Sequence, residues 1–136
     1  MVEVIIETTK LREVIDITSE VEQELKSIDI GEGMCTLFVR HTTCALSTAD
    51  LDPGTDKDMI KAFGQLVPRL DYIHPHDPTH VQDHILATLI GPSVCIPFKG
   101  SKLKLGKWQR VVLIEFNGPA KRSLVFAFDK ELSSSK

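Results

Sequence analysis

Residues 93–128, SVCIPFKGSKLKLGKWQRVVLIEFNGPAKRSLVFAF, decide the fold class of this chain. Runs rich in Val, Ile, Leu and Phe are separated by Lys99-Gly100 and Asn117-Gly118-Pro119, and both separators carry turn chemistry. The spacing predicts four strands, over residues 93–98, 103–105, 108–116 and 123–128.

The N-terminal half adds further strands. Residues 2–7 and 11–17 alternate loosely between apolar and polar, which predicts two neighbouring strands joined as a hairpin. Residues 34–48 contain neither Gly nor Pro and predict one long strand, or two strands with a bend.

Three helices are predicted between these strands. The first has apolar residues at Val21, Leu25 and Ile28 after a capping-box spacing of Ser19 and Glu22. Apolar residues at helical spacing over 59–67 and 81–89 predict the other two, the former closed by Pro68 and the latter by Gly91-Pro92. Asp52 or Thr55 would cap the second helix, and Asp77 or Thr79 the third.

This order of elements predicts a mainly β or α+β fold: a single antiparallel β-sandwich-like domain over residues 1–130, with about three short helices. Strands gathered at both ends do not give the alternation of a doubly wound fold. No Gly-rich loop joins a strand to a helix, which argues against dinucleotide and P-loop sites. Residues 131–136 are polar and are expected to form a flexible tail.

The composition argues against several kinds of partner and location for this protein. Sixteen Lys and Arg against 19 Asp and Glu give a net charge of -3, which argues against a nucleic-acid partner. No apolar run is long enough to span a bilayer, and no signal peptide is evident, so we expect a cytoplasmic protein without a membrane partner. Three cysteines are few, and an odd number, for a disulfide framework, so they are interpreted as small buried apolar residues.

Histidines mark the first candidate site. His74, His76, His80 and His84 fall within eleven residues, a pattern that suits a metal site or acid–base chemistry. Asp77 and Asp83 could orient an imidazole. Solvated loop histidines, with His84 packed in the core, would explain the same spacing.

The run Arg40-His41-Thr42-Thr43-Cys44 is the second candidate, because an Arg-His pair followed by two hydroxyls suits an anion pocket. An exposed strand face explains these residues equally well, and Cys44 would be nucleophilic only beside a base. Glu115 lies in an apolar run, where a buried carboxylate needs a partner. A salt bridge to Arg122 across the 117–119 turn or a catalytic role would account for it.

Several short motifs occur together in one order. They are His41-Thr42-Thr43, Asp52-Pro53, Tyr72-Ile73-His74, His84-Ile85, Gly91-Pro92-Ser93, Leu105-Gly106-Lys107-Trp108-Gln109, Glu115-Phe116-Asn117-Gly118-Pro119 and Arg122. This combination resembles the YjbQ-like family, small proteins named after a secondary thiamine-phosphate synthase activity. His76, Asp77 and Pro78 resemble its archaeal-type branch.

The resemblance implies a β-sandwich-like homotrimer. It also implies a site with His41, His74 and His84 as catalytic residues and as ligands of a divalent metal, zinc or magnesium, with Glu115 as a further catalytic residue. The implied ligand or anion contacts are Arg40, Thr42, Thr43, Trp108, Gln109 and Arg122. The chain departs from the family pattern at residues 48–51, at Asp83 and at Ala120, where an arginine is usual and Lys121 or Arg122 could compensate.

Two functions are expected. The first, which the resemblance implies, is an enzyme that weakly joins a pyrimidine diphosphate to a thiazole phosphate; this reaction needs cations for the leaving pyrophosphate and often a divalent metal. The second is a metal- or small-ligand-binding trimer, with a hydrolase-like activity or with no catalysis.

Overall fold

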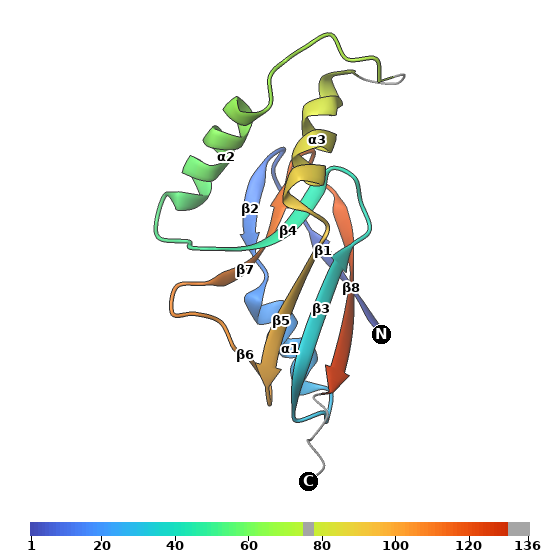
Figure 1. The fold of residues 1–136 in the computed structure, drawn as a ribbon, viewed down its shortest axis with the longest axis vertical. Coiled ribbons are helices and arrows are strands. Elements are labelled where there is room, and N and C mark those ends of the chain that lie inside the picture. The colour runs from blue at the N-terminus through green and yellow to red at the C-terminus, as the bar shows by residue number, and fades with distance from the viewer. Residues whose placement is uncertain (75–77, 131–136) are drawn as a thin grey trace.

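The computed structural model describes residues 1–74 and 78–130 and contains two antiparallel sheets (Figure 1). The five-stranded sheet has the order β1 (Val2–Glu7), β8 (Lys121–Lys130), β3 (Glu32–Val39), β5 (Ser93–Lys99), β6 (Lys102–Leu103). The three-stranded sheet has the order β2 (Glu13–Asp16), β7 (Arg110–Glu115), β4 (Cys44–Ala49). The helices are α1 (Thr18–Lys26), α2 (Thr55–Leu66) and α3 (Val81–Ile90), with a 3-10 turn at Pro78–His80. The predicted fold class is confirmed.

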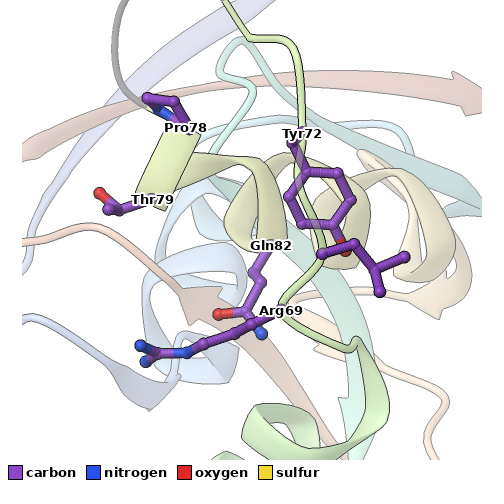
Figure 2. A pocket seen from close by; sticks show the side chains of 6 residues that line it. Arg69, Tyr72, Pro78, Thr79 and Gln82 are labelled. Carbon is purple, nitrogen blue, oxygen red and sulfur yellow. The ribbon is translucent and has the colours of Figure 1, made fainter.

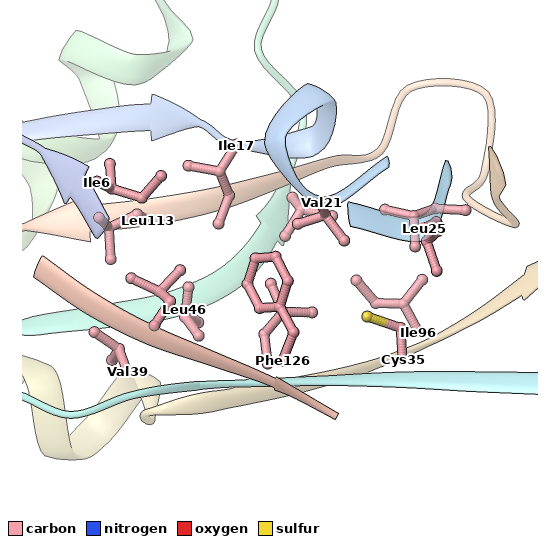
Figure 3. Packing of buried hydrophobic residues seen from close by; sticks show 14 of the residues in the cluster. Ile6, Ile17, Val21, Leu25, Cys35, Val39, Leu46, Ile96, Leu113 and Phe126 are labelled. Carbon is pink, nitrogen blue, oxygen red and sulfur yellow. The ribbon is translucent and has the colours of Figure 1, made fainter. Parts of the chain in front are cut away.

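The main hydrophobic core lies between the two sheets (Figure 3). Strand β7 shows why its sequence is a continuous apolar run rather than an alternating one. Val111 and Leu113 face this main core, whereas Val112 and Ile114 belong to a second core on the other face of the strand. A strand that is buried on both faces has no position left for a solvent-facing polar residue.

Helices α2 and α3 supply the cover for the second face of the small sheet. Phe63 of α2 packs edge-on against Phe116, with ring centroids 5.9 Å apart, and Leu86 of α3 is fully buried. Helix α1 instead contributes Val21 and Leu25 to the main core between the sheets. The three helices therefore serve two different cores.

The predicted N-terminal hairpin is wrong. Strand β1 pairs with β8 and strand β2 pairs with β7, so the two strands belong to different sheets. The Thr8 N–H donates to the Ala120 carbonyl at 2.8 Å, which continues the pairing of the first strand with β8. Alternation in the sequence indicates the strands, but it does not specify their partners.

The predicted side-chain caps of α1 and α2 are wrong, although all three helices are confirmed. No side chain caps α1; Glu22 instead accepts the Leu103 N–H at 2.9 Å, while Asp16 accepts that of Thr18 at 3.0 Å. Helix α2 begins after Gly54, whose φ of 93° suits glycine, and α3 begins after His80 without a side-chain cap. Asp77 and the predicted tail over 131–136 lie outside the described residues.

The bend expected within 34–48 falls at residues 40–43, between β3 and β4. These two strands lie in different sheets, so the four residues cross from one sheet to the other. In the described parts of the chain, no helix has the length and apolar character required to traverse a bilayer.

The turn between β7 and β8 admits only glycine at position 118. A Cβ there would lie 2.2 Å from the Lys10 carbonyl oxygen and 2.8 Å from the Thr8 hydroxyl oxygen. We predict that Gly118→Ala destabilises the protein by about 1–3 kcal/mol or more, because the backbone must move to relieve the clash. In the control Gly64→Ala, on α2, the nearest atom would be 3.7 Å away, and helix propensity favours Ala by about 1 kcal/mol. Thermal melts that rank the two variants in the opposite order would contradict this packing.

Candidate functional site

The loop of residues 40–43 is held from three sides by backbone hydrogen bonds. The Arg40 N–H donates to the Ser123 carbonyl on β8 at 3.1 Å, and the Phe116 N–H donates to the Thr43 carbonyl at 3.1 Å. Immediately before the loop, the Val39 N–H donates to the Pro92 carbonyl at 2.8 Å. The polar side chains of the loop are therefore presented from a fixed backbone.

A buried ion pair lies beside this loop. Glu115 is fully buried and Arg122 is 5% exposed. Arg122 Nε donates to Glu115 Oε1 at 2.8 Å and Nη2 donates to Oε2, a two-point contact. Nη2 also donates to the Thr43 hydroxyl at 2.9 Å, which ties the pair to the loop. The predicted salt bridge between these residues is therefore present.

Glu115 is an ionised group with a full set of donors. The Thr8 hydroxyl donates to Oε1 at 2.6 Å, and the Asn117 N–H donates to Oε2 at 3.2 Å. Burial alone would raise the pKa of Glu115, but the bonds from Arg122, Thr8 and Asn117 outweigh burial and hold that pKa below its ordinary value. This arrangement suits a residue that positions Arg122; the predicted catalytic role stays a prediction.

His41 is fixed as the neutral imidazole. Its Nε2 accepts the Ser123 N–H at 2.8 Å, so the ring proton resides on Nδ1. Burial and the charge of Arg122 lower the pKa of His41. Both effects favour the form that can accept this hydrogen bond.

His84, on α3, donates a hydrogen bond to the backbone, whereas His41 accepts one. Its Nδ1 lies 3.0 Å from the Thr42 carbonyl oxygen, which only accepts, so Nδ1 carries the proton and Nε2 keeps its lone pair. The His74 ring stacks on it, with centroids 5.1 Å apart and planes within 22°. Both histidines and Thr42 line a cavity of about 350 Å³, together with Tyr72, Ile73 and Val81.

The expected metal ligands do not converge within a single chain. Over residues 1–74 and 78–130, no group of three or more His, Cys, Asp or Glu side chains could hold a metal ion. His41 Nε2 already accepts the Ser123 amide, which leaves His84 with an available Nε2. The predicted zinc or magnesium ion stays a prediction; His76 lies outside the described residues.

The remaining predicted contacts are divided between two ends of the small sheet. Thr42 and Thr43 lie in the site, and Arg40 lies beside it with Nη1 3.5 Å from Glu3. Gln109, however, bonds to Gly106 and to Thr48 at the far end of β4, and Trp108 is 64% exposed next to it. Cys44 pairs with Glu115 at one end of β4, and Ala49 pairs with Arg110 at the other. The contacts near Thr43 and those near Gln109 are therefore separated by the length of this strand.

The structure bears on two further expectations. Asp83 binds Arg12 at 2.6 Å, so this carboxylate anchors α3 to the segment between β1 and β2. Its role of orienting an imidazole stays a prediction. Burial raises the pKa of the Cys44 thiol to about 12, which argues against a nucleophile there. Cys35 is buried as well, whereas Cys95 is exposed, contrary to the expectation for all three.

Sequence reasoning missed two residues of this site, Thr8 and Ser123. A threonine before a turn and a serine in a strand carry no distinctive signal, and only the pairing of β1 with β8 places them here. It also missed a pocket of about 200 Å³ between the segment after α2 and the start of α3. Figure 2 shows Arg69, Tyr72 and Gln82 around this pocket, which none of the predicted site residues lines.

Comparison with known proteins identifies the family of this chain. A family described as UPF0047 protein YjbQ-like matches residues 2–131. The chain belongs to this family.

Relatives of the YjbQ-like family occur in both archaea and bacteria. A UPF0047 protein of Archaeoglobus fulgidus is 36% identical over 124 residues, covering 90% of this chain and 96% of the relative. The UPF0047 protein YugU of Bacillus subtilis is 33% identical over 119 residues, covering 87% and 90%. The archaeal-type branch therefore stays a prediction.

Solved structures share the fold of this chain. A crystal structure from Clostridium acetobutylicum, described as an uncharacterized conserved protein of the YjbQ/UPF0047 family, has a TM-score of 0.85 at 28% identity and covers 95% of this chain and 100% of its own. A hypothetical protein of Aeropyrum pernix gives 0.86 at 28% identity, covering 95% and 97%.

The ion pair predicts a specific response to acid. The folded-state pKa of Glu115 lies below the ordinary 4.5, so its stabilisation is complete above about pH 4.5 and is lost as the pH falls through the folded-state value. Urea unfolding from pH 7 to pH 3 should show that Glu115→Gln lowers stability at neutral pH and flattens this acid dependence. The control Glu7→Gln removes an exposed pair with Lys121 and should change little. Equal acid dependence in Glu115→Gln and wild type would contradict the assignment.

Proposed function

We propose that the loop of residues 40–43, together with Arg122 and His84, binds and transforms a small phosphorylated molecule. The observation that carries this proposal is the state of Arg122. Glu115 occupies one edge of the guanidinium, while Nη1 has no hydrogen-bond partner among the described residues. Among the described residues, the only buried side-chain nitrogen or oxygen without a partner is Ser123 Oγ, so Nη1 is not completely enclosed, although the Arg122 side chain is only 6% exposed. An anion beside Thr43 would receive donors from Nη1 and the loop.

Ser123 supports the same proposal. Its hydroxyl is buried without a partner among residues 1–74 and 78–130, on the residue whose N–H binds His41. A buried unpaired hydroxyl is costly, and a bound oxyanion would satisfy it.

His84 supplies the proton-transfer group. Its Nδ1 proton is directed at a carbonyl oxygen, which orients the ring and leaves Nε2 as a base or, once protonated, as an acid. Nε2 is therefore the atom that exchanges a proton with the bound molecule.

The finer reaction is the one that the family resemblance implies, the weak joining of a pyrimidine diphosphate to a thiazole phosphate. Pyrophosphate is the leaving group, and a fixed guanidinium stabilises the charge that develops on it. Arg122 fits this role, whereas Lys121 pairs with Glu7 on the surface at 3.7 Å, so Arg122 is the better replacement for the arginine absent at Ala120.

The alternative is a metal- or small-ligand-binding homotrimer with a hydrolase-like activity or no catalysis. The stacked His74 and His84 favour it, because His84 Nε2 would be one ligand and further ligands would come from elsewhere. Ile5, Met34 and Phe38 of the five-stranded sheet are 49%, 39% and 46% exposed, which supports burial between copies. Sedimentation equilibrium at micromolar concentration distinguishes a trimer from a monomer.

We predict that His84→Asn lowers turnover of pyrimidine diphosphate plus thiazole phosphate by about 10²–10⁴-fold, because the proton-transfer group is lost. Binding of the thiazole phosphate should change much less, since Arg122 is retained. The control is His80→Asn, one turn earlier at the start of α3. Product formation followed by chromatography gives the rate.

If wild type makes no product while the protein binds zinc, and His84→Asn removes that zinc, the metal-binding alternative replaces the enzyme. If His84→Asn and His80→Asn turn over equally, His84 is not the proton-transfer group.

A further inference from the structure

A second polar pocket lies at the opposite end of the small sheet from the histidines. It has a volume of about 300 Å³ and opens between β4 and β5, which belong to different sheets. Its polar lining comes from Ser47, Thr48, Lys104 and Gln109. Thr48 of β4 lies five residues after Thr43, which immediately precedes the strand; this separation is about 17 Å at the rise of an antiparallel strand.

The segment beside this pocket is strongly cationic. Residues 99–110, KGSKLKLGKWQR, carry five Lys and Arg and no Asp or Glu in a chain of net charge -3. Lys102 pairs with Glu22 at 3.7 Å, and Arg110 pairs with Asp16 at 2.7 Å. Lys104 lines this pocket and also an adjoining one that contains Glu32 and Asp129, yet neither carboxylate forms an ion pair with it in the described part of the chain. The Lys104 ammonium group is therefore available to a ligand.

Gln109 and Thr48 are the available neutral donors of the pocket, since the Ser47 hydroxyl donates to the Thr48 carbonyl at 3.3 Å. Gln109 Oε1 accepts the Gly106 N–H at 2.7 Å, so the side-chain amide is oriented, and its Nε2 lies 3.4 Å from the Thr48 hydroxyl. That hydroxyl accepts from Nε2 and keeps its own proton available. The Lys104 N–H binds the Pro97 carbonyl at 2.8 Å, which fixes the backbone that carries the ammonium group.

No Asp or Glu side chain lines this pocket among the described residues. An ammonium, an amide N–H and a hydroxyl proton around one cavity match an oxyanion and would repel a cation. Trp108, next in sequence to Gln109, is 64% exposed, with Lys107 Nζ 4.9 Å from its ring centroid. An exposed aromatic ring offers a stacking surface to a planar organic group.

We propose that the pocket between β4 and β5 is a phosphate-binding site, in which Lys104, Gln109 and Thr48 hold the phosphate or pyrophosphate group of a small molecule. The site is separate from the histidine cavity and does not rest on the function proposed for it. Free pyrophosphate and a phosphate ester of a planar heterocycle share this chemistry; the ester also reaches Trp108.

Trp108 makes the test specific, because it is the only tryptophan in the chain. Pyrophosphate and a nucleoside monophosphate are titrated separately, with Trp108 fluorescence as the signal at constant ionic strength. We expect a saturable change with each, and at least tenfold weaker binding in Lys104→Met, which removes the ammonium from an exposed side chain. Tighter binding of the nucleotide than of pyrophosphate assigns the site to an ester, and the reverse assigns it to the free anion.

The matched controls are Lys99→Met, which removes a charge from the same segment outside the pocket, and His84→Asn in the other site. Both should bind as wild type does. Equal weakening in Lys104→Met and Lys99→Met would show only general electrostatic attraction and would overturn the proposal. So would a fluorescence response to single-stranded RNA alone, which would indicate a nucleic-acid surface.

Discussion

The buried ion pair of Glu115 and Arg122 is the interaction on which the arrangement of the site depends. It joins β7 of the small sheet to β8 of the large one, and both partners lie almost entirely out of solvent. A buried ion pair is stable only when hydrogen bonds satisfy most of its remaining polar atoms. Thr8, Asn117 and Thr43 supply those hydrogen bonds, so the pair also fixes the chain segments that carry them.

This constraint explains how a small protein with two sheets holds a polar site in place. The loop of residues 40–43 crosses between the sheets, and its position is set by Arg122 on one side and by His84 on the other. The two histidines His41 and His84 are held as opposite partners, one accepting a backbone N–H and the other facing a carbonyl oxygen. Fixed tautomers are what a proton-transfer site requires.

The local sequence pattern predicted the helices and strands well, but it did not predict which strands pair with each other. Apolar periodicity located α2, α3 and the four C-terminal strands, because burial on a helix or strand face is recorded in nearby residues. The partner of β1 lies more than a hundred positions away at β8, and no local signal encodes that choice. Motifs identified His41, Thr43, His84 and Arg122, but Gln109 lies at the other end of β4, since a motif does not give its place in space. Gln109 instead lines the pocket between β4 and β5.

A double-mutant cycle on Glu115 and Arg122 tests the central claim most directly. Urea unfolding at pH 7 of Glu115→Gln, Arg122→Met and the double variant gives the free energies of unfolding. Each single variant leaves one buried charge unpaired and should lose about 3–5 kcal/mol, whereas the double variant should lose clearly less than the sum. Losses that add to within about 0.5 kcal/mol would contradict the account, because the two residues would then stabilise the protein independently.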